Sequence, residues 1–392
     1  MPRRTYTSFM QIRKAFRFKN CAATIAVAIA ALVLNTAARG FYTPDQTSEF
    51  FFTAAAAVKY NDNVFLQNSG QTGLTIFDLT PGFEYDYGKG SLIEGVFAFN
   101  ETFSLYSQDS SKLSDDLADI SFTAKYENGK SKAKLDAAFQ QLDQSTVDIH
   151  RNGYLVKRNV TEVDSGGETG LTAKTSIGAE VTYNDTDYTT AGYDSLQYVE
   201  IPVNYYYEVD PGLDVSAGFR FRNNTLTGAA PESDDYFFNV GARGEFTPKI
   251  TGEFNVGYQV RKFTEGGDQN GLGLTAKFTY AYSPVTTFTI GLDNDFGYAA
   301  VGTPQRLSGG NIGVRNALNA QWSLNGQFGY TRYDYTTTAQ RDGFYTGQVG
   351  VTFQYSHTIS FAATYSYSQD SSNLRNASFE NNIVSLTGTL RE

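Results

Sequence analysis

Hydrophobic and polar residues alternate along most of this chain. Residues 249–263 read KITGEFNVGYQVRKF, in which Phe254 and Tyr258 occupy even positions while Glu253 and Arg261 occupy odd ones. A period of two predicts a β-strand with one apolar and one polar face. The apolar face of such a strand points either into the core of a soluble sandwich or into the lipid around a membrane barrel.

The strands are predicted to follow one another as a repeat of hairpins. Short turn-like breaks recur from YGKGS near Lys89 to YSHTIS near His357, roughly 35 to 46 residues apart, which suits two long strands and a loop. Eight short breaks and nine longer segments, rich in Asn, Asp, Ser and Gly, separate about 18 strands. A solenoid or a propeller can also repeat at this length. Neither explains strands this long with so few residues for a buried core.

The predicted fold class is therefore all-β. Residues 49–392 are expected to form one transmembrane antiparallel up-and-down β-barrel of about 18 strands, with 16 as the alternative. Its short turns are expected on the periplasmic side and its longer loops on the extracellular side. The composition agrees, because 15% of the residues are aromatic, with 27 Tyr and 30 Phe, and these residues favour strands and lipid–water boundaries.

The N-terminal segment predicts export from the cytoplasm. Six Lys and Arg residues precede the apolar run CAATIAVAIAALVL, and small residues follow it around Ala38, as in a secretory signal peptide. We expect a cleaved signal peptide at residues 1–38 and a short periplasmic tail at 39–48, with a short membrane anchor as the alternative. Cleavage removes the single cysteine and changes the net charge from −10 to about −16. This charge argues against nucleic acid or an anionic membrane surface as the main partner.

The alternation also predicts which side chains face a wet lumen. A charge that faces lipid is costly, so charged residues that alternate with apolar ones are expected to point inward. In FTIGLDNDF, residues 288–296, this rule places Leu292 and Phe296 outward. Outward aromatic residues beside the short turns are expected to form a girdle at the inner-leaflet interface. The predicted lumen-facing residues are Arg220, Arg222, Arg243, Glu245, Glu253, Arg261, Lys277, Asp293 and Asp295, and the predicted girdle is Tyr87, Tyr126, Tyr207, Phe246, Tyr282, Trp322 and Tyr355.

The chain offers little that would support catalysis or metal binding. Its two histidines, His150 and His357, fall in a predicted outer loop and a predicted inner turn, so neither a Ser-His-Asp site nor a zinc site is expected. The polar segments at residues 61–63 and 233–235 lack the spacing of a calcium loop and are expected to be solvated loop residues. We therefore expect no enzymatic activity, no cofactor and no metal.

Three segments carry a resemblance to a known family. They are YNDNVF at residues 60–65, LTPGFEYDYG at 79–88 and QYVEIPVNYYYEVDPGLDVSAGFRFR at 197–222. Together they resemble the outer-membrane family named putative β-barrel porin 2. The resemblance implies a location in the outer membrane of a Gram-negative bacterium, in contact with lipid. Members of this family are often associated with exopolysaccharide export, so it also implies a polysaccharide and a periplasmic polysaccharide-export protein as partners.

Three functions fit these observations. The resemblance favours an outer-membrane conduit for a secreted exopolysaccharide; a general solute-diffusion porin is the alternative, and a non-conducting structural or adhesion barrel is less favoured. About 18 strands should enclose a lumen too wide for side chains alone to close. The loops, expected to hold mostly about 8 to 15 residues, offer no obvious folded plug. An open pore is therefore expected.

Overall fold

The computed structural model describes residues 41–42, 47–108, 113–143 and 154–392. The predicted signal peptide at residues 1–38, most of the predicted tail and His150 lie outside the described residues. In the described part, no helix is long and apolar enough to cross a membrane.

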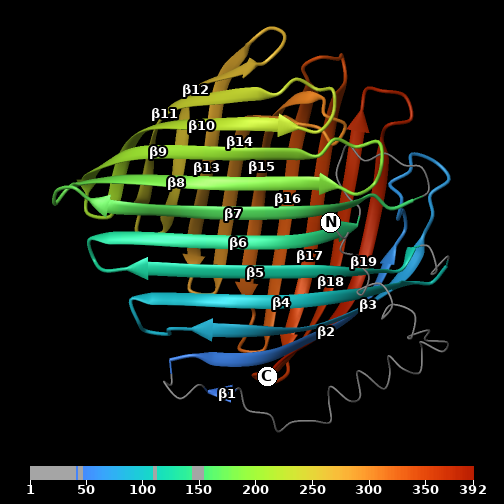
Figure 1. Ribbon diagram of the computed structural model, residues 1–392. Helices are drawn as coiled ribbons and strands as arrows, with labels where there is room; N and C mark the ends of the chain where they lie inside the picture. Colours follow the sequence, from blue (N-terminus) through green and yellow to red (C-terminus); the bar gives the residue numbers. More distant parts are fainter. Residues whose placement is uncertain (1–40, 43–46, 109–112, 144–153) are drawn as a thin grey trace, which may run out of the picture. The chain divides into compact units, whose positions relative to one another are not determined.

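Residues 49–392 form an up-and-down barrel of long antiparallel strands (Figure 1). The two-residue strand β1 pairs with the start of β2. The strands are β1 (Phe41–Tyr42), β2 (Glu49–Asn61), β3 (Leu74–Tyr87), β4 (Ile93–Tyr106), β5 (Asp115–Glu127), β6 (Ser131–Asp143), β7 (Lys157–Gly170), β8 (Thr175–Tyr188), β9 (Leu196–Asp210), β10 (Leu213–Leu226), β11 (Ser233–Thr247), β12 (Ile250–Phe263), β13 (Gln269–Ser283), β14 (Thr286–Tyr298), β15 (Pro304–Ala317), β16 (Trp322–Tyr335), β17 (Arg341–Gln354), β18 (Ile359–Ser372) and β19 (Phe379–Arg391).

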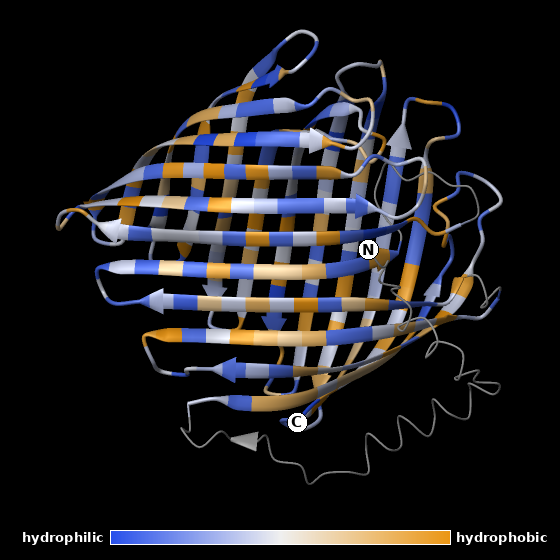
Figure 2. Ribbon diagram, in the orientation of Figure 1, coloured by the Kyte–Doolittle hydropathy of each residue, from blue (hydrophilic) through white to orange (hydrophobic). Residues whose placement is uncertain are grey.

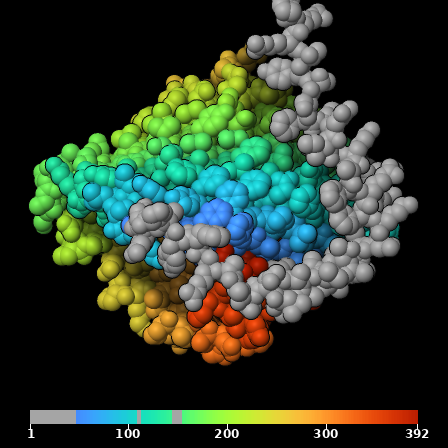
Figure 3. Space-filling model, turned by 60° about the horizontal axis from the view of Figure 1, so that its bottom comes forward, coloured from blue at the N-terminus to red at the C-terminus, as the bar shows by residue number. Residues whose placement is uncertain are grey.

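The barrel is closed by pairing between its last and first long strands. In β19 and β2, Leu386 lies opposite Val58 and Leu390 lies opposite Ala54, and Figure 3 shows the two ends of the colour scale side by side. Every other long strand pairs with its neighbours in the sequence, including β9 with β10. The prediction of a closed antiparallel barrel of about 18 strands is confirmed by β2–β19.

Apolar and polar side chains alternate along the strands, as Figure 2 shows by colour. The apolar set remains exposed: Val240, Leu272 and Phe328 are 59%, 55% and 52% exposed. A soluble barrel would not leave such side chains uncovered around its whole wall, whereas lipid covers them in a transmembrane barrel.

The two ends of the barrel differ. At one end the strands join through turns such as Pro211–Gly212, where Gly212 has a φ of 83°, a left-handed conformation that glycine adopts without strain. We call this the turn end and the opposite end the loop end. Most connections at the loop end are shorter than the expected 8 to 15 residues, for example residues 264–268 and 299–303. The expectation was wrong because the long strands hold 13 to 15 residues and take up part of the segments that were interpreted as loops.

Candidate functional site

The inner face of the barrel is identified by contacts between strands that are not neighbours. The guanidinium group of Arg243 on β11 donates to Glu168 on β7 at 2.8 and 2.7 Å. These strands are four spacings apart, or about 19 Å along the sheet. Side chains on a convex surface diverge, so this bidentate contact requires the concave face. Cross-strand register then assigns other residues to the same face.

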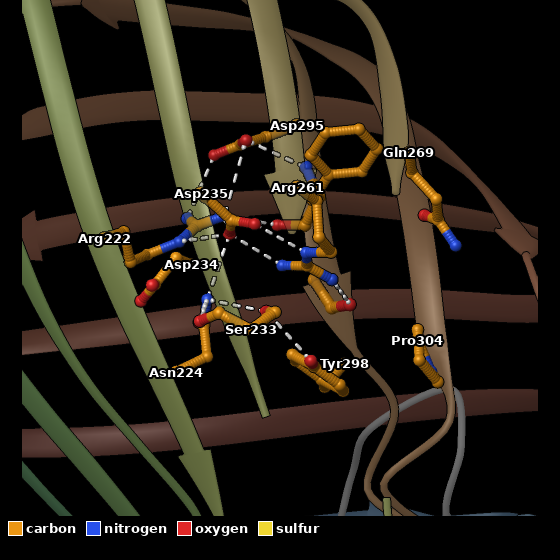
Figure 4. Close-up of polar contacts among 12 residues, drawn as sticks. Arg222, Asn224, Ser233, Asp234, Asp235, Arg261, Gln269, Asp295, Tyr298 and Pro304 are labelled. Atoms are coloured by element: carbon orange, nitrogen blue, oxygen red, sulfur yellow. Dashed lines mark hydrogen bonds and ion pairs between the residues drawn. The ribbon is translucent and has the colours of Figure 1, made fainter. Parts of the chain in front are cut away.

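A row of alternating charges crosses this face toward the loop end. Its members lie directly opposite one another on β9, β10, β11 and β12: Glu200, Arg222, Asp235 and Arg261. Arg222 Nη2 and Arg261 Nη2 are each 2.7 Å from Oδ2 of Asp235. Opposite charges in direct register stabilise a sheet, and Figure 4 shows both arginines converging on Asp235. We call these four residues the loop-end row.

A second row with the same alternation lies closer to the turn end. It consists of Asp214, Arg243, Glu253 and Lys277 on β10 to β13. Arg243 Nε donates to Asp214 at 3.0 Å, and its guanidinium carbon lies 3.4 Å from the ring centroid of Tyr206. Five of the nine residues predicted to face the lumen belong to the two rows. Two more are joined to the loop-end row: Asp295 contacts Arg222, and Arg220 Nη2 lies 2.8 Å from Asp295.

The remaining predicted lumen residues lie apart from this network. Asp293 is exposed and lies opposite Thr275 and Gly309. Glu245 is exposed near the turn end, opposite Thr251. Register places both side chains on the same face as the two rows, without bringing them to a common point.

The wall formed by β16 to β19 has a different chemistry. Away from its ends, most positions on the inner face carry hydroxyl, amide or small side chains, with Phe344 and Ile383 as apolar exceptions. The charged residues Asp342, Asp370 and Arg391 lie near the strand ends. We call this surface the neutral wall. Its polar members are Ser323, Asn325, Gln327, Thr331, Thr346, Gln348, Thr352, Ser360, Thr364, Ser366, Ser368, Asn381, Ser385, Thr387 and Thr389.

The inner face of β5 to β7 is acidic. Asp136 and Asp164 lie directly opposite each other, and Asp119 and Glu162 lie on the same face nearby. Lys132 and Lys134 of β6 reach instead to Glu168 and Glu180, at 3.2 and 3.0 Å. The four carboxylates form no ion pair with another described residue. Like charges in direct register destabilise a sheet, so the repulsion between Asp136 and Asp164 lowers the stability of the barrel at this place. We call it the acidic wall.

The β2–β3 loop folds onto the inner face instead of projecting away from it. Val64 and Phe65 of this loop are 2% and 8% exposed and belong to an apolar cluster with Leu74, Ile76 and Tyr106. Leu74 and Ile76 share their face with Asp78, which forms an ion pair with the inward Lys59. This loop therefore takes up space on the inner face, although no folded plug was expected from the loop lengths. The apolar loop sequence VFL was the signal for inward packing.

The end of β14 separates from β13 and turns inward, while β15 stays paired with β16 as far as Gln305. Pairing between β13 and β14 stops at Leu274 and Asn294, although β13 begins at Gln269 and β14 continues to Tyr298. A Cβ atom at Gly271, directed inward, would lie 2.5 Å from the guanidinium nitrogens of Arg306 on β15. The side chain of Arg306 therefore lies on the inner face of β13. We call residues 295–305 the inner hairpin.

Phe296 shows the consequence for the predicted orientation. Its place in the alternation of β14 predicts an outward side chain, but it is 4% exposed and lies 5.1 Å from the guanidinium carbon of the inward Arg261. The prediction failed because the whole strand end has moved inward, so that its outer side rests on the inner side of β12 and β13.

The predicted girdle residues lie at or beside strand ends near the turns. Tyr355, Tyr282 and Tyr87 are 64%, 58% and 50% exposed. Phe246 is less exposed because it packs against Phe254 and Phe278 at ring distances of 6.2 and 5.4 Å. The other members are Tyr207 at 44%, Trp322 at 42% and the half-buried Tyr126. That they form a membrane-interface girdle stays a prediction.

Sequence reasoning missed the acidic partners of the arginines. Asp235 was expected to be a solvated loop residue, but it is a paired residue of β11 and is 2% exposed between two arginines. Glu168 and Glu200 were not predicted as members of the site. Glu200 lies in register with Arg222 on the neighbouring strand, whereas Glu168 reaches Arg243 across four strand spacings, and the pattern of one strand reveals neither relationship. In the described residues, no group of three or more His, Cys, Asp or Glu side chains could hold a metal ion.

The comparisons with known proteins agree with this architecture. The family described as "Putative beta-barrel porin 2" matches residues 207–392, so the predicted resemblance is confirmed over this part of the chain, which holds β10–β19. No curated protein matches the sequence. The exposed apolar outer face and the family match are both typical of an outer-membrane, porin-like barrel.

Several solved structures are similar over most of their length. OccK2 (OpdF) of Pseudomonas aeruginosa in complex with glucuronate is 10% identical, with 90% of this chain and 100% of that chain covered and a TM-score of 0.49. OpdK of P. aeruginosa with vanillate is 10% identical over 88% and 99%, with a TM-score of 0.47. OccAB4 of Acinetobacter baumannii is 11% identical over 89% and 100%, with a TM-score of 0.47.

Proposed function

We propose that this protein is the outer-membrane conduit for a secreted polysaccharide. In this proposal the protein arrives in the outer membrane after export and cleavage of residues 1–38. The observation that carries the proposal is the neutral wall of β16 to β19. In this proposal the nine predicted charged residues line the lumen, and the seven aromatic residues hold the turn end at the membrane interface.

A long hydrated polymer needs a surface that binds it weakly at many places. Hydroxyl and amide groups such as those of Gln327, Gln348 and Thr364 can exchange hydrogen bonds with sugar hydroxyls and with water, and each exchange changes the free energy little. Gln327 and Gln348 already share a hydrogen bond of 3.1 Å on an exposed part of the wall. A glycan chain could thus slide along the neutral wall without being trapped at one point.

The acidic wall restricts the kind of glycan that fits. A polymer of uronate or phosphate groups would meet the carboxylates of Asp136, Glu162 and Asp164 in a confined space, where like charges repel over roughly a Debye length of 8 to 10 Å. An uncharged polysaccharide avoids this repulsion. The proposal therefore favours an uncharged glycan. Export would also need a periplasmic protein, which would dock at the turn end.

A general solute porin is the second candidate. The inner hairpin favours it, because this element takes up space inside the loop end of the barrel. A small solute would pass such a narrowed section more easily than a bulky branched polymer. A polar lumen with both charges and amides suits small hydrophilic solutes equally well.

Deletion of the gene in its host distinguishes the candidates. The deletion strain and strains complemented with the wild type would be assayed for surface polysaccharide and for uptake of small hydrophilic solutes. Loss of surface polysaccharide, with polymer retained in the periplasm and uptake unchanged, supports the conduit. Unchanged polysaccharide with impaired uptake would overturn it in favour of a porin, and no change in either would favour a structural barrel.

A further inference from the structure

We propose that the inner hairpin, residues 295–305, is a movable constriction that sets the width of the pore at the loop end, and that Arg222 and Arg261 are the positioning residues that hold it inward. The inference rests on the barrel being a channel, but not on which solute the channel carries. Three groups of contacts hold the hairpin in its inward position. The alternation of its sequence also fits a second position, in the wall beside β13.

The first contacts replace the missing strand pairing. Arg222 Nη2 donates to the carbonyl oxygen of Phe296 at 2.7 Å, and Arg261 Nη1 donates to that of Gly297 at 2.8 Å. On β13, which has lost its pairing with the end of β14, the carbonyl oxygen of Leu272 accepts from Gln259 Nε2 at 2.9 Å and from Arg306 Nη2 at 2.8 Å. Buried backbone groups need such partners. Side chains therefore satisfy peptide groups that pairing between β13 and β14 would otherwise satisfy.

The second contacts hold the aromatic side chains of the hairpin against the inner wall. Tyr298 is 8% exposed, and its hydroxyl group lies 2.8 Å from the carbonyl oxygen of Pro231 and 2.9 Å from Ser233 Oγ. The guanidinium carbon of Arg261 lies 4.6 Å from its ring centroid. Figure 4 shows Tyr298 directed toward Ser233 from a different strand pair.

The third contacts join the tip of the hairpin to loops from another part of the barrel. Ala300 is 6% exposed and packs with Val156, Tyr188 and Tyr193. Its carbonyl oxygen accepts from the backbone N–H of Asp194 at 2.9 Å. These partners belong to the ends or connections of β7, β8 and β9, whereas the hairpin leaves the wall at β14. The tip therefore reaches well away from its own place in the wall.

The sequence of the hairpin also fits a position in the wall. If the register of Leu274 with Asn294 continued, Phe296 would lie opposite Leu272 and Tyr298 opposite Asn270. Leu272 is outward and 55% exposed, so Phe296 would join it in the apolar outer band, as the alternation of β14 predicts. Asp295 would keep its inward direction. The alternation of β14 thus suits pairing with β13. The contacts of Arg222 and Arg261 instead stabilise the inward position of the hairpin.

The test is single-channel conductance of the purified full-length barrel in planar bilayers. The F296A/Y298A variant removes the two rings that hold the hairpin. F328A/Y330A is the matched control, because it removes the same residue types from the outer face of β16, where they are 52% and 36% exposed. We expect F296A/Y298A to raise conductance roughly twofold or more, because conductance follows the cross-section open to ions, and the control to conduct as the wild type does.

A second variant keeps the test decisive if the first fails to fold. A300E places a carboxylate among Val156, Tyr188 and Tyr193 without changing a strand, and A339E in the β16–β17 connection is its control. Folding is checked by heat-modifiable migration in SDS gels. A rise in conductance with A300E, or a first appearance of conductance if the wild type is closed, supports the constriction. Wild-type conductance, or none at all, in every folded hairpin variant overturns it.

The second position is tested directly with a disulfide. L272C/F296C would be made in a C21S background, which removes the only native thiol. Oxidation should form the disulfide, and it should hold conductance at the raised level until a reductant is added. Thiols that stay free under oxidant would contradict the proposed pairing with β13. A failure of polysaccharide export in the host would leave these results unaffected.

Discussion

Leu292 and Asp293 are consecutive residues of β14, and both are exposed, yet register places their side chains on opposite faces of the wall. Leu292 lies opposite Ala276 and Gly310, whereas Asp293 lies opposite Thr275 and Gly309. Exposure alone does not separate lipid from water around such a barrel. A reagent that dissolves only in water distinguishes the two, because it reaches only the side chains that face water.

The first prediction uses this pair. In a C21S background and in lipid vesicles, D293C should react rapidly with a charged, membrane-impermeant thiol reagent that enters the pore. L292C should react at least about tenfold more slowly, because lipid covers its side chain. The measurement is the fraction of protein labelled with time. Equal labelling of the two cysteines, or faster labelling of L292C, would show that the assignment of the two faces is wrong.

The second prediction concerns the cost of charge on each face. Val349 is 55% exposed near the middle of β17, and Gln348 precedes it on the neutral wall. V349R should lower the free energy of unfolding in lipid by about 2 to 4 kcal/mol, because the guanidinium group would lie in the hydrocarbon layer. Q348R should change it by less than about 1 kcal/mol, as expected of a substitution in water. Urea-induced unfolding in vesicles measures both, and a larger loss for Q348R would contradict the account.

The alternation of residues was sufficient to predict the barrel, because strand period and hairpin spacing are local properties. It also placed the charged side chains of β10 to β14 on one face. It did not predict that Arg222 and Arg261 would share Asp235, since their register joins three strands. It was misleading for Phe296, because a local pattern describes one strand position while the observed position depends on contacts with β8, β9 and β12. Loop length likewise did not reveal that Val64 and Phe65 pack inward.

The third prediction concerns the buried centre of the loop-end row. Arg261 is fully buried and donates to both carboxylate oxygens of Asp235, at 2.6 and 2.7 Å. R261M should destabilise the barrel by roughly 3 to 5 kcal/mol, because removing one partner of a buried ion pair leaves the other under-compensated. The temperature at which the folded band is lost in SDS gels should fall. R332M, on an exposed arginine of β16, is the control and should migrate as the wild type does.

The fourth prediction is that the pore selects cations. The acidic wall places Asp136, Glu162 and Asp164 along the lumen without described ion-pair partners, and confined charge of one sign enriches counter-ions. In a salt gradient, the wild type should show a reversal potential of the sign expected for cation preference. The amide variant D136N/E162Q/D164N should move it toward zero, while E265Q in the β12–β13 connection should not. An anion-selective wild type would contradict this reading of the lumen.

The most direct measurement of the central claim is the single-channel current of the purified barrel in a planar bilayer, recorded with neutral oligosaccharides added on the turn-end side. If the barrel is a conduit for an uncharged glycan, insertions should give discrete conductance steps, and oligosaccharides should interrupt the current for times that lengthen with chain length. Charged oligosaccharides of equal length should interrupt it less often. A folded barrel that gives no conductance steps, or steps that neutral oligosaccharides leave unchanged at every length, would contradict the account.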